Sequence, residues 1–382
     1  MVDPKDKRAQ RRKRKERKKP GLITFLQKGG LNWLLVFVPV SVVVELLGLP
    51  ELWLFITSAL AIIPLAGLIG QATEQLASRV GPGVGGLLNA TFGNATELII
   101  ALFALRAGLY EVVKASISGS IIGNILLVLG LSMAVGGWGR VKQSFNRTSA
   151  GASSAMLFLA VVGLVMPAVF DLAVFGSLER TAPDIESLSL LVAFVLIATY
   201  LASLVFSLKT HRDLFISVPE EPEPEEAHLS VANSLILLAV ATVLTAVEAE
   251  FLVVGIREAT SALGMTEFFV GVIVVAVVGN AAEHFAAVSM AMKDKMDLAV
   301  TIATGSSTQI ALFVAPVLVF ASFLFGRPMS LVFNAFEIVA IALSVLVLAV
   351  VSLDGESNWF EGVQLLAVYV VLAIVFFFVP AA

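Results

Sequence analysis

The architecture of this chain follows from the segment Gly93-Asn94-Ala95-Thr96-Glu97-Leu98, which Gly279-Asn280-Ala281-Ala282-Glu283-His284 repeats in the second half of the sequence. Each copy places a carboxylate within a segment that is otherwise nearly all apolar. The pairs Gly119-Ser120 and Gly305-Ser306 keep the same spacing as the two copies, without an insertion or deletion. Two motifs that recur at the same distance along the chain indicate an internal duplication of about half the chain.

The composition is that of a protein embedded in a membrane. Of the 382 residues, 58% are hydrophobic and 14% are charged. In soluble domains about 45–50% of the residues are apolar and about 25% are charged. The mean hydropathy is +0.95. The chain has no cysteine, which excludes disulfides, thiolate metal sites and cysteine nucleophiles. The three histidines do not have the spacing of a zinc site.

Apolar runs of the length that a membrane-spanning helix needs, roughly 20 residues, recur along the chain. Eleven candidates lie near residues 31–49, 52–72, 84–106, 114–137, 150–170, 187–207, 230–254, 267–291, 298–325, 329–352 and 359–380. The first apolar run is too long for a signal peptide and lacks a small-residue cleavage site. The sequence therefore predicts an all-α polytopic membrane protein with eleven transmembrane helices.

A basic segment precedes the first span, since residues 1–20 hold 11 of the 25 lysines and arginines. Such a run is also found in nuclear addresses and nucleic-acid-binding arms. On a membrane protein, a cytoplasmic tail that follows the positive-inside rule is the better interpretation, so we expect no nucleic-acid partner. Odd-numbered spans then run outward. This orientation places basic residues in cytoplasmic loops (Lys142, Arg147, Lys209, Arg212, Lys293, Lys295) but also in outward loops (Arg106, Lys114, Arg180, Arg257, Arg327).

An acidic segment divides the two copies. Residues 218–227 contain five glutamates and three prolines and cannot form a core. A regulatory cation site is one interpretation of this segment, and a plain solvated linker is the other. The expected organisation is a basic cytoplasmic tail (1–30), a leading helix (31–49), a first five-helix repeat (50–215), an acidic cytoplasmic linker (216–229) and a second five-helix repeat (230–382). Because five is odd, the second repeat enters the membrane from the opposite side, an inverted topology that is typical of secondary transporters.

The two duplicated carboxylates are the strongest candidates for function. An ionised glutamate near the bilayer centre costs roughly 2.5–3.5 kcal/mol, and Glu97 and Glu283 would face each other across the pseudo-twofold axis. Either protonation or a divalent cation between them removes the repulsion, and carboxylate, amide and hydroxyl oxygens are the ligands that calcium prefers. Competition between proton and cation for the same oxygens is the coupling that an antiporter needs. The alternative is a pair of buried, satisfied acids.

Other polar residues share helix faces with these carboxylates or follow on the next span. Asn94 and Asn280 lie three residues before the glutamates, Ser120 and Asn124 are four apart, and Ser306 and Gln309 are three apart. The alternative role for these residues is hydrogen bonding between helices. His284 is either a proton acceptor or a polar residue packed on a neighbouring helix. Glu74, Glu248 and Glu250 are further acids that could line an ion path or pair with interfacial arginines.

These motifs resemble the cation/proton exchanger (CAX) family of the calcium/cation antiporter superfamily. The resemblance extends over roughly residues 50–380 and is strongest in the two repeated segments 93–98 and 279–284, which we call the signatures. Three further segments carry it: Gly119-Ser-Ile-Ile-Gly-Asn124, Lys293-Asp-Lys-Met-Asp-Leu298 and Gly305-Ser-Ser-Thr-Gln-Ile-Ala-Leu-Phe-Val314. It implies calcium/proton antiport, with Glu97 and Glu283 as carriers of both ions and Asn94, Asn280, Ser120, Asn124, Ser306 and Gln309 lining the site. Sodium-exchanging relatives tend to have further acidic ligands, and no acid stands at 120–124 or 305–310 here.

The hypothesis from the sequence is a secondary active antiporter that moves Ca²⁺ out of the cytoplasm in exchange for H⁺, with no cofactor. A sodium/calcium exchanger is the alternative within transporters, and a cation channel is the alternative from another class. The sequence contains no pairing of a nucleophile with a base that would indicate an enzyme. The absence of sorting signals favours a prokaryotic inner (plasma) membrane, and the sequence is compatible with a homo-oligomer.

Overall fold

A computed structural model of the chain describes residues 30–80, 82–176, 183–211 and 229–380. The basic tail and the acidic linker expected from the sequence fall almost entirely outside these residues. Within them, seven helices are long and apolar enough to cross a membrane, or eight if a pair of helices bent by 58° counts as one span. The chain is a mostly helical, polytopic integral membrane protein.

Helical segments lie over each of the eleven ranges expected from the sequence. In the first half these segments are η1 (Asn32–Val36), α3 (Phe37–Leu46), α4 (Glu51–Val80), α5 (Pro82–Phe92), α6 (Ala95–Arg106), α7 (Tyr110–Ile122), η2 (Gly123–Val128), α8 (Leu129–Gly136), α9 (Arg147–Phe175), α10 (Pro183–Val205) and η3 (Phe206–Thr210). In the second half they are α11 (Val231–Leu263), α12 (Glu267–Phe269), η5 (Val270–Val275), α13 (Ala276–Gly279), α14 (Ala281–Met292), α15 (Met296–Gln309), η6 (Ile310–Val314), α16 (Ala315–Leu324), α17 (Ala335–Val351) and α18 (Trp359–Phe377).

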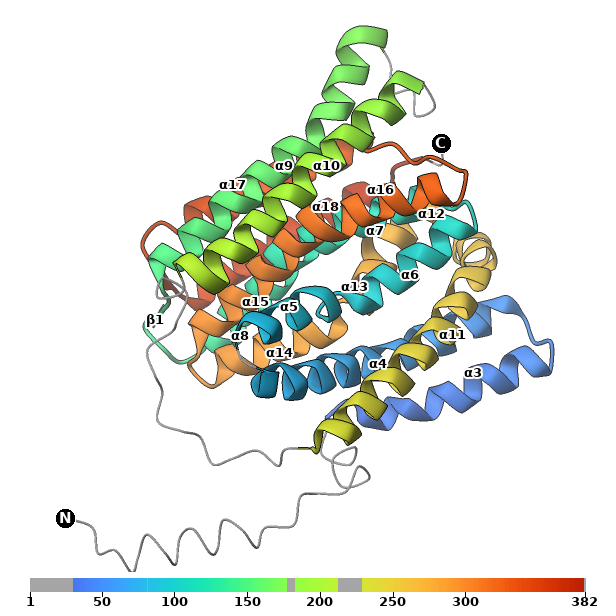
Figure 1. The fold of residues 1–382 in the computed structure, drawn as a ribbon, viewed down its shortest axis with the longest axis horizontal. Helices are drawn as coiled ribbons and strands as arrows, with labels where there is room; N and C mark the ends of the chain where they lie inside the picture. The colour runs from blue at the N-terminus through green and yellow to red at the C-terminus, as the bar shows by residue number, and fades with distance from the viewer. Residues whose placement is uncertain (1–29, 81, 177–182, 212–228, 381–382) are drawn as a thin grey trace, which may run out of the picture.

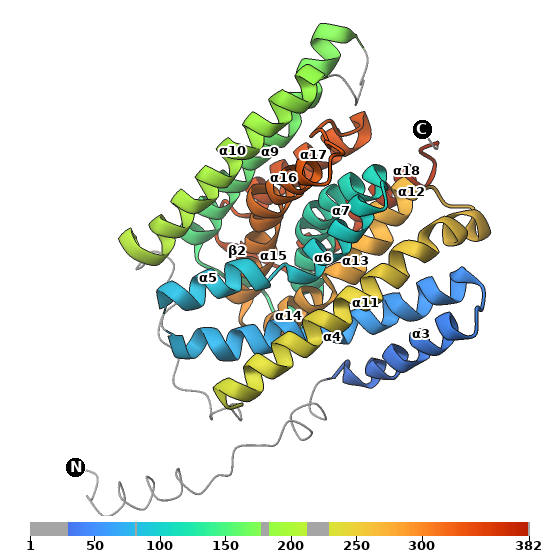
Figure 2. The ribbon, with the colours of Figure 1, turned by 45° about the vertical axis from the view of Figure 1, so that its right-hand side comes forward.

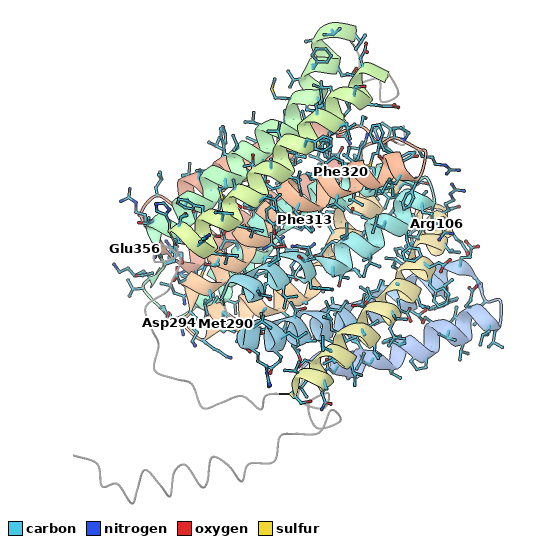
Figure 3. The ribbon with its side chains drawn as sticks, in the orientation of Figure 1. Arg106, Met290, Asp294, Phe313, Phe320 and Glu356 are labelled. Carbon is cyan, nitrogen blue, oxygen red and sulfur yellow. The ribbon has the colours of Figure 1, made fainter. Side chains whose placement is uncertain are left out.

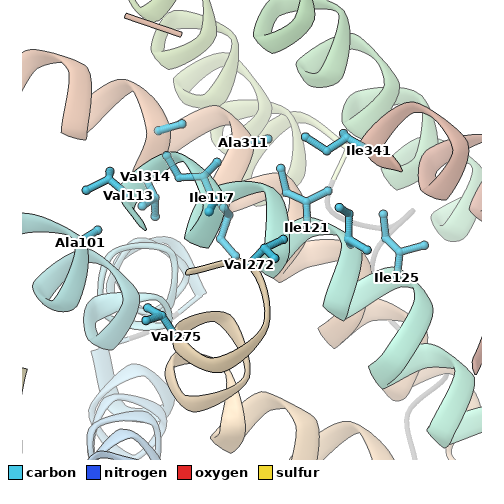
Figure 4. Close-up of a cluster of buried hydrophobic side chains, with 14 of the residues drawn as sticks. Ala101, Val113, Ile117, Ile121, Ile125, Val272, Val275, Ala311, Val314 and Ile341 are labelled. Carbon is cyan, nitrogen blue, oxygen red and sulfur yellow. The ribbon is translucent and has the colours of Figure 1, made fainter. Parts of the chain in front are cut away.

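The helices divide into two flanks with a central group between them. Figures 1 and 2 show α3, α4 and α11 side by side on one flank and α9 and α10 on the other, with α6, α7, α13 and α15 between them. A short antiparallel pair, β1 (Gln143–Ser144) with β2 (Glu356–Ser357), joins two loops at one end. The apolar core runs through the central group, and Figure 4 shows part of it around Ile117, Ile121 and Val272.

The duplication seen in the sequence is also present in the backbone. Helices α6 and α14 are equal in length. Their first residues, and likewise their last residues, are separated along the chain by the same number of residues as the two signatures, and so are the first residues of α7 and α15. Gly108 and Asp294 follow α6 and α14 at equal distance, and both have a positive φ, of 79° and 64°. Figure 3 places Arg106, the end of α6, near one end of the molecule, and Met290 and Asp294 near the opposite end.

The expectation that each signature lies within one continuous span is wrong. The span expected at 84–106 is broken between α5 and α6 at Gly93-Asn94, and the span expected at 267–291 bends by 58° at Asn280. Glycine and asparagine are poor helix formers, and a Cβ at Gly93 would lie 2.5 Å from the carbonyl oxygen of Asn89. Each glutamate therefore lies in the first turn of a new helix.

The span expected at 329–352 is helical only from Ala335. Residues 329–333 form no regular secondary structure, and each is at most 2% exposed. Irregular backbone within a membrane protein persists only where its polar groups find partners. Lys114 donates to the carbonyl of Val332 at 3.0 Å, and the amide of Leu331 donates to Ser189 at 2.9 Å. Lys114 and Arg257, expected in outward loops, lie in α7 and α11 instead.

Candidate cation site

The two signature helices begin side by side, at asparagines that do not cap them. Asn94 and Asn280 hold the N-cap positions of α6 and α14, yet neither side chain accepts a hydrogen bond from its own helix. Both side chains are at most 2% exposed and are used between helices. Glu97 and Glu283 follow in the first turns, where the positive end of the helix dipole stabilises an anion.

The next span of each repeat contains a π-helical segment at the level of the asparagines. Segment η2 contains Asn124 and follows the turn of α7 that holds Ser120, while η6 begins directly after Gln309 of α15. A π-helical turn shifts the side chains that follow it and is frequent at functional sites. The spacing of the polar residues contained no signal for these segments.

One hydrogen-bonded network connects the six polar residues singled out in the sequence. The Nδ2 of Asn280 donates to Ser120 Oγ at 2.8 Å. The Nδ2 of Asn124 donates to Ser306 Oγ at 3.0 Å and to Asn280 Oδ1 at 3.2 Å. The hydroxyl of Ser306 donates to Asn94 Oδ1 at 3.1 Å, and Asn94 Nδ2 donates to Gln309 Oε1. Four helical elements from the two halves of the chain therefore meet through their side chains.

Glu97 lies against the second signature. A Cβ built on Gly279 would be 3.1 Å from Glu97 Cγ, so a side chain at this position would require the glutamate to shift by a few tenths of an ångström. Its Oε1 is buried and has no hydrogen-bond partner among the described residues. The same side chain lines a small cavity of about 10 Å³ together with Ser116 and Ser120. Ser116 was not singled out in the sequence, although it lies four residues before Ser120, on the same face of α7.

Glu283 lines a much larger cavity, of about 380 Å³. Glu74, Gln71 and Asn89 also line it, as does Asn32 at the start of the leading helix. Of the acids expected along an ion path, Glu74 therefore lies with the site. The Oε2 of Glu283 is buried without a hydrogen-bond partner in the described part of the chain.

The two carboxylates interact with each other electrostatically. In residues 30–80, 82–176, 183–211 and 229–380, neither forms an ion pair with a lysine or arginine. Nor does this part of the chain hold a group of three or more His, Cys, Asp and Glu side chains suited to a metal ion. A cation between the two glutamates would therefore need amide and hydroxyl oxygens as further ligands, which is the donor set of the network and one that suits calcium.

The remaining candidates lie apart from this network. Glu248 is fully buried in α11 and accepts a hydrogen bond from Ser41 of the leading helix at 2.7 Å. Glu250 is exposed on the same helix. Neither lines the cavities at Glu97 and Glu283. His284 follows Glu283 in α14 and is partly exposed.

Comparison with known proteins identifies relatives over nearly the whole chain. A sequence model of the sodium/calcium exchanger protein family matches residues 50–209 and 233–378. The Ca(2+)/H(+) antiporter of Aphanothece halophytica is 47% identical, over 91% of this chain and 96% of its own length. The Ca(2+)/H(+) antiporter ChaA of Bacillus subtilis is 46% identical, over 89% of this chain and 96% of its own length. A vacuolar cation/proton exchanger of Oryza sativa is 40% identical, over 91% of this chain and 81% of its own length.

Solved structures give the same result. Native YfkE superposes with a TM-score of 0.79 at 43% identity, covering 91% of this chain and all of its own. An H⁺/Ca²⁺ exchanger, CAX, superposes with a TM-score of 0.69 at 15% identity, which shows a common fold. The chain therefore belongs to the sodium/calcium exchanger protein family, and within it to the cation/proton exchangers that its signatures resemble.

Proposed function

We propose that the protein is a secondary active antiporter that moves Ca²⁺ out of the cytoplasm in exchange for H⁺ by alternating access. One observation carries this proposal: two carboxylates from duplicated halves, without a basic partner among the described residues, begin adjacent helices joined by a network of amide and hydroxyl oxygens. The names of the relatives, Ca(2+)/H(+) antiporters at 46–47% identity, support it.

The chemistry follows from the charge of the two glutamates. With both ionised and no cation present, the two anions repel each other. A divalent cation between them cancels this charge, with oxygens of Asn94, Asn280, Ser120, Asn124, Ser306 and Gln309 as further ligands. Two protons cancel it equally well. Each ion therefore displaces the other, and each loaded state is neutral enough to change its exposure from one side of the membrane to the other. Calcium is the substrate, and no cofactor is required.

The same architecture supports eleven spans, with one leading helix and two inverted five-helix repeats (50–215 and 230–382). Helices α6 and α14 start together at the asparagines and end at opposite ends of the molecule (Figure 3). Matching helices that run in opposite directions from a common centre are what an inverted duplication produces. On this proposal α3 and α17, which are shorter than a full span, also cross the membrane, and the buried non-helical residues 329–333 complete the span of α17.

The orientation follows from the tail. If the basic residues 1–30 are cytoplasmic, the cavity at Glu283 opens toward the cytoplasm, because it is lined by Asn32 at the start of the leading helix. Glu74 and Glu283 then receive the outgoing cation. Glu97 lies nearer the outer side, and His284 assists proton exchange at Glu283. The proposed location is a prokaryotic inner membrane.

A sodium/calcium exchanger is the second candidate within the family. The structures of the exchanger NCX_Mj superpose at TM-scores of 0.52–0.53 but at 18–19% identity, which bears on the fold alone. The network around the glutamates consists of amides and hydroxyls without a third acid, which favours protons over sodium. A channel would leave the inverted duplication without a role.

The test uses inverted membrane vesicles that contain the full-length protein and have an acid interior. Calcium uptake and the pH gradient are recorded together. We expect uptake that consumes the pH gradient in the native protein and in the control Glu250→Gln, and no uptake in either Glu97→Gln or Glu283→Gln. Uptake that requires sodium and ignores the pH gradient would overturn the proposal, as would flux that follows only voltage and the calcium gradient.

A further inference from the structure

The leading helix, formed by η1 and α3, is attached to the rest of the molecule along a narrow stripe. Of its residues, Leu34, Ser41 and Val44 are buried, whereas Trp33 and Val36 are more than half exposed. Figures 1 and 2 show α3 at the edge of the molecule, next to α4. Between helices in a bilayer the hydrophobic effect gives no attraction, so close packing and hydrogen bonds decide how such a helix is held.

One hydrogen bond to another helix lies within this stripe. The hydroxyl of Ser41 donates to Glu248 Oε1 of α11 at 2.7 Å, and both side chains are fully buried. The second oxygen of Glu248, Oε2, is buried and has no hydrogen-bond partner among the described residues. Burying a carboxyl group with an unpaired oxygen costs stability. Fixing the register of two helices is the best attested use of a buried polar group of this kind.

The duplication separates Glu248 from the residues of the cation site. Under the spacing of the two signatures, the counterpart of Glu248 is Ile62, a buried residue of α4. The acid is therefore present in one half only, whereas the acids of the site, Glu97 and Glu283, are present in both. The leading helix also has no counterpart in the second half. An acid without a counterpart thus binds the one helix that stands outside the duplication.

The other end of the leading helix lies at the large cavity. Residues 30–32 line this cavity together with Glu74 and Glu283. A Cβ on Gly30 would lie 3.5 Å from the ring of Phe285, which also lines the cavity and follows Glu283 in α14 by two residues. The leading helix therefore extends from a contact with α11 to a contact with α14 beside Glu283.

A wall at this place affects how strongly the cavity attracts cations. A cleft that carries charge of one sign between walls of low dielectric constant concentrates counter-ions, because the walls focus the electric field. The cavity of about 380 Å³ holds the carboxylates of Glu74 and Glu283, and residues 30–32 form part of its side. Movement of the leading helix away from α11 would open this side and spread the field of the two acids.

We propose that the leading helix is a wall of the calcium entrance and that the Ser41–Glu248 hydrogen bond holds this wall in place. Ser41 and Glu248 are positioning residues, because neither lines the cavity and both act through residues 30–32. This inference rests on the proposed calcium/proton exchange. It adds to that exchange a helix that lies outside the duplication and gives the buried acid of α11 a role without placing it on the ion path.

The first measurement is the initial rate of proton-driven uptake into inverted vesicles that contain the full-length protein, over a range of calcium concentrations. Glu248→Leu removes the bond between the helices. It leaves no orphaned hydroxyl, because Ser41 Oγ also lies 2.8 Å from the carbonyl oxygen of Val38 in its own helix. Glu248→Gln keeps an acceptor for Ser41. Glu250→Leu is the matched control, since Glu250 is an exposed acid of the same helix.

The second measurement reports the position of the wall without any transport. The chain has no cysteine, so cysteines introduced at Gly30 and Phe285 are its only thiols. A short bifunctional thiol reagent should join them while the wall is in place, and mass spectrometry of the proteolytic peptides measures the yield. The same cysteine pair is introduced together with Glu248→Leu, Glu248→Gln and Glu250→Leu.

We expect Glu248→Leu to raise the calcium concentration for half-maximal uptake about five- to tenfold, with the maximal rate within about twofold of the native protein. The yield of the cross-link should fall in the same variant. Glu248→Gln and Glu250→Leu should match the native protein in both measurements. Ser41→Ala combined with Glu248→Leu should have the effect of Glu248→Leu alone, because the two substitutions remove one shared hydrogen bond.

An unchanged half-maximal concentration or an unchanged cross-link in Glu248→Leu would overturn the inference. Equal effects of the leucine and glutamine variants would overturn it as well, because they would show that the charge of Glu248 matters rather than its bond to Ser41. Native vesicles without proton-driven uptake would instead refute the proposed function, and the cross-link would still test whether Glu248 holds the leading helix in place.

Discussion

Glu97 packs directly on Gly279, although the two residues lie in opposite halves of the chain. Gly279 is the first residue of the second signature and the last residue of α13, just before the bend at Asn280. In the first signature, a Cβ on Gly93 would lie 3.6 Å from Gln309 Oε1, an ordinary van der Waals distance. The first signature therefore packs on the second at Gly279, where the missing side chain leaves room for Glu97.

Replacing Gly279 with alanine should displace Glu97 without unfolding the protein. The added Cβ, 3.1 Å from Glu97 Cγ, moves the carboxylate by a few tenths of an ångström, while alanine in a helix is about 0.5–1 kcal/mol more favourable than glycine. We expect proton-driven calcium uptake to fall by about tenfold or more, with no loss of thermal stability in detergent. Gly151→Ala is the control, because no atom lies within 4 Å of the added Cβ there. Native uptake in Gly279→Ala would show that the position of Glu97 is not critical.

The sequence predicted which residues meet, but not how the backbone brings them together. The six polar residues expected to line the site form one hydrogen-bonded network, as expected for a duplicated set of side chains that face the centre of the molecule. They are Asn94, Asn280, Ser120, Asn124, Ser306 and Gln309. The length of the apolar runs predicts where spans lie, but not where they end: α4 ends at Val80 and α11 at Leu263, against expected ends near 72 and 254. Assignment of these residues to calcium and protons stays a prediction.

The parts that could not be predicted from the sequence depend on tertiary contacts. The unpredicted features are the helix breaks at Asn94 and Asn280, the π-helical segments η2 and η6, and the irregular residues 329–333. The only local signals near them are glycines, asparagines and the prolines Pro316 and Pro328. Each is stabilised by partners far away in the chain, such as Lys114 for the carbonyl of Val332. Glu248 resembled a path residue in the sequence because its partner, Ser41, lies 207 residues away.

Lys114 should be essential for stability rather than for transport. It is 4% exposed, donates to Ser330 and Val332, and interacts electrostatically with Glu337 and Asp171. Removing one partner of a buried ionic cluster costs about 3–5 kcal/mol, so we expect Lys114→Met to lower the free energy of unfolding by this amount. A second substitution, Asp171→Asn, should restore part of the loss.

Denaturant unfolding of the purified protein in detergent measures this effect. Lys142→Met is the matched control: Lys142 pairs with Glu356 at 2.5 Å, but both side chains are about half exposed, and such pairs contribute at most about 1 kcal/mol. Equal stabilities of the two variants would mean that the cluster at Lys114 contributes no more than a surface pair.

Glu248 should tolerate the substitution that inactivates Glu97. Its Oε1 accepts from Ser41 at 2.7 Å, and a glutamine at this position keeps an oxygen of the same shape in the same place. We therefore expect Glu248→Gln to retain proton-driven calcium uptake, while Ser41→Ala lowers stability by about 0.5–1.5 kcal/mol through the lost hydrogen bond. Abolished uptake in Glu248→Gln would place this residue on the ion path after all.

Glu74 should affect how the cation is captured rather than how it is carried. It lines the 380 Å³ cavity that reaches Glu283, but it is absent from the hydrogen-bonded network around the two signature glutamates. A negative charge in a cleft raises the local concentration of cations, and the effect weakens with ionic strength. Glu74→Gln should thus raise the calcium concentration for half-maximal uptake about three- to tenfold and leave the maximal rate nearly unchanged.

Initial rates of uptake into inverted vesicles at low and high potassium chloride measure both quantities. The difference between native protein and Glu74→Gln should shrink at high salt, because screening removes the attraction that the variant lacks. Glu51→Gln, an exposed acid at the start of the same helix, should behave like the native protein at both salt concentrations. A lowered maximal rate in Glu74→Gln at saturating calcium would instead mean that Glu74 binds the cation during translocation, and that the site extends beyond the two signature glutamates into the cavity.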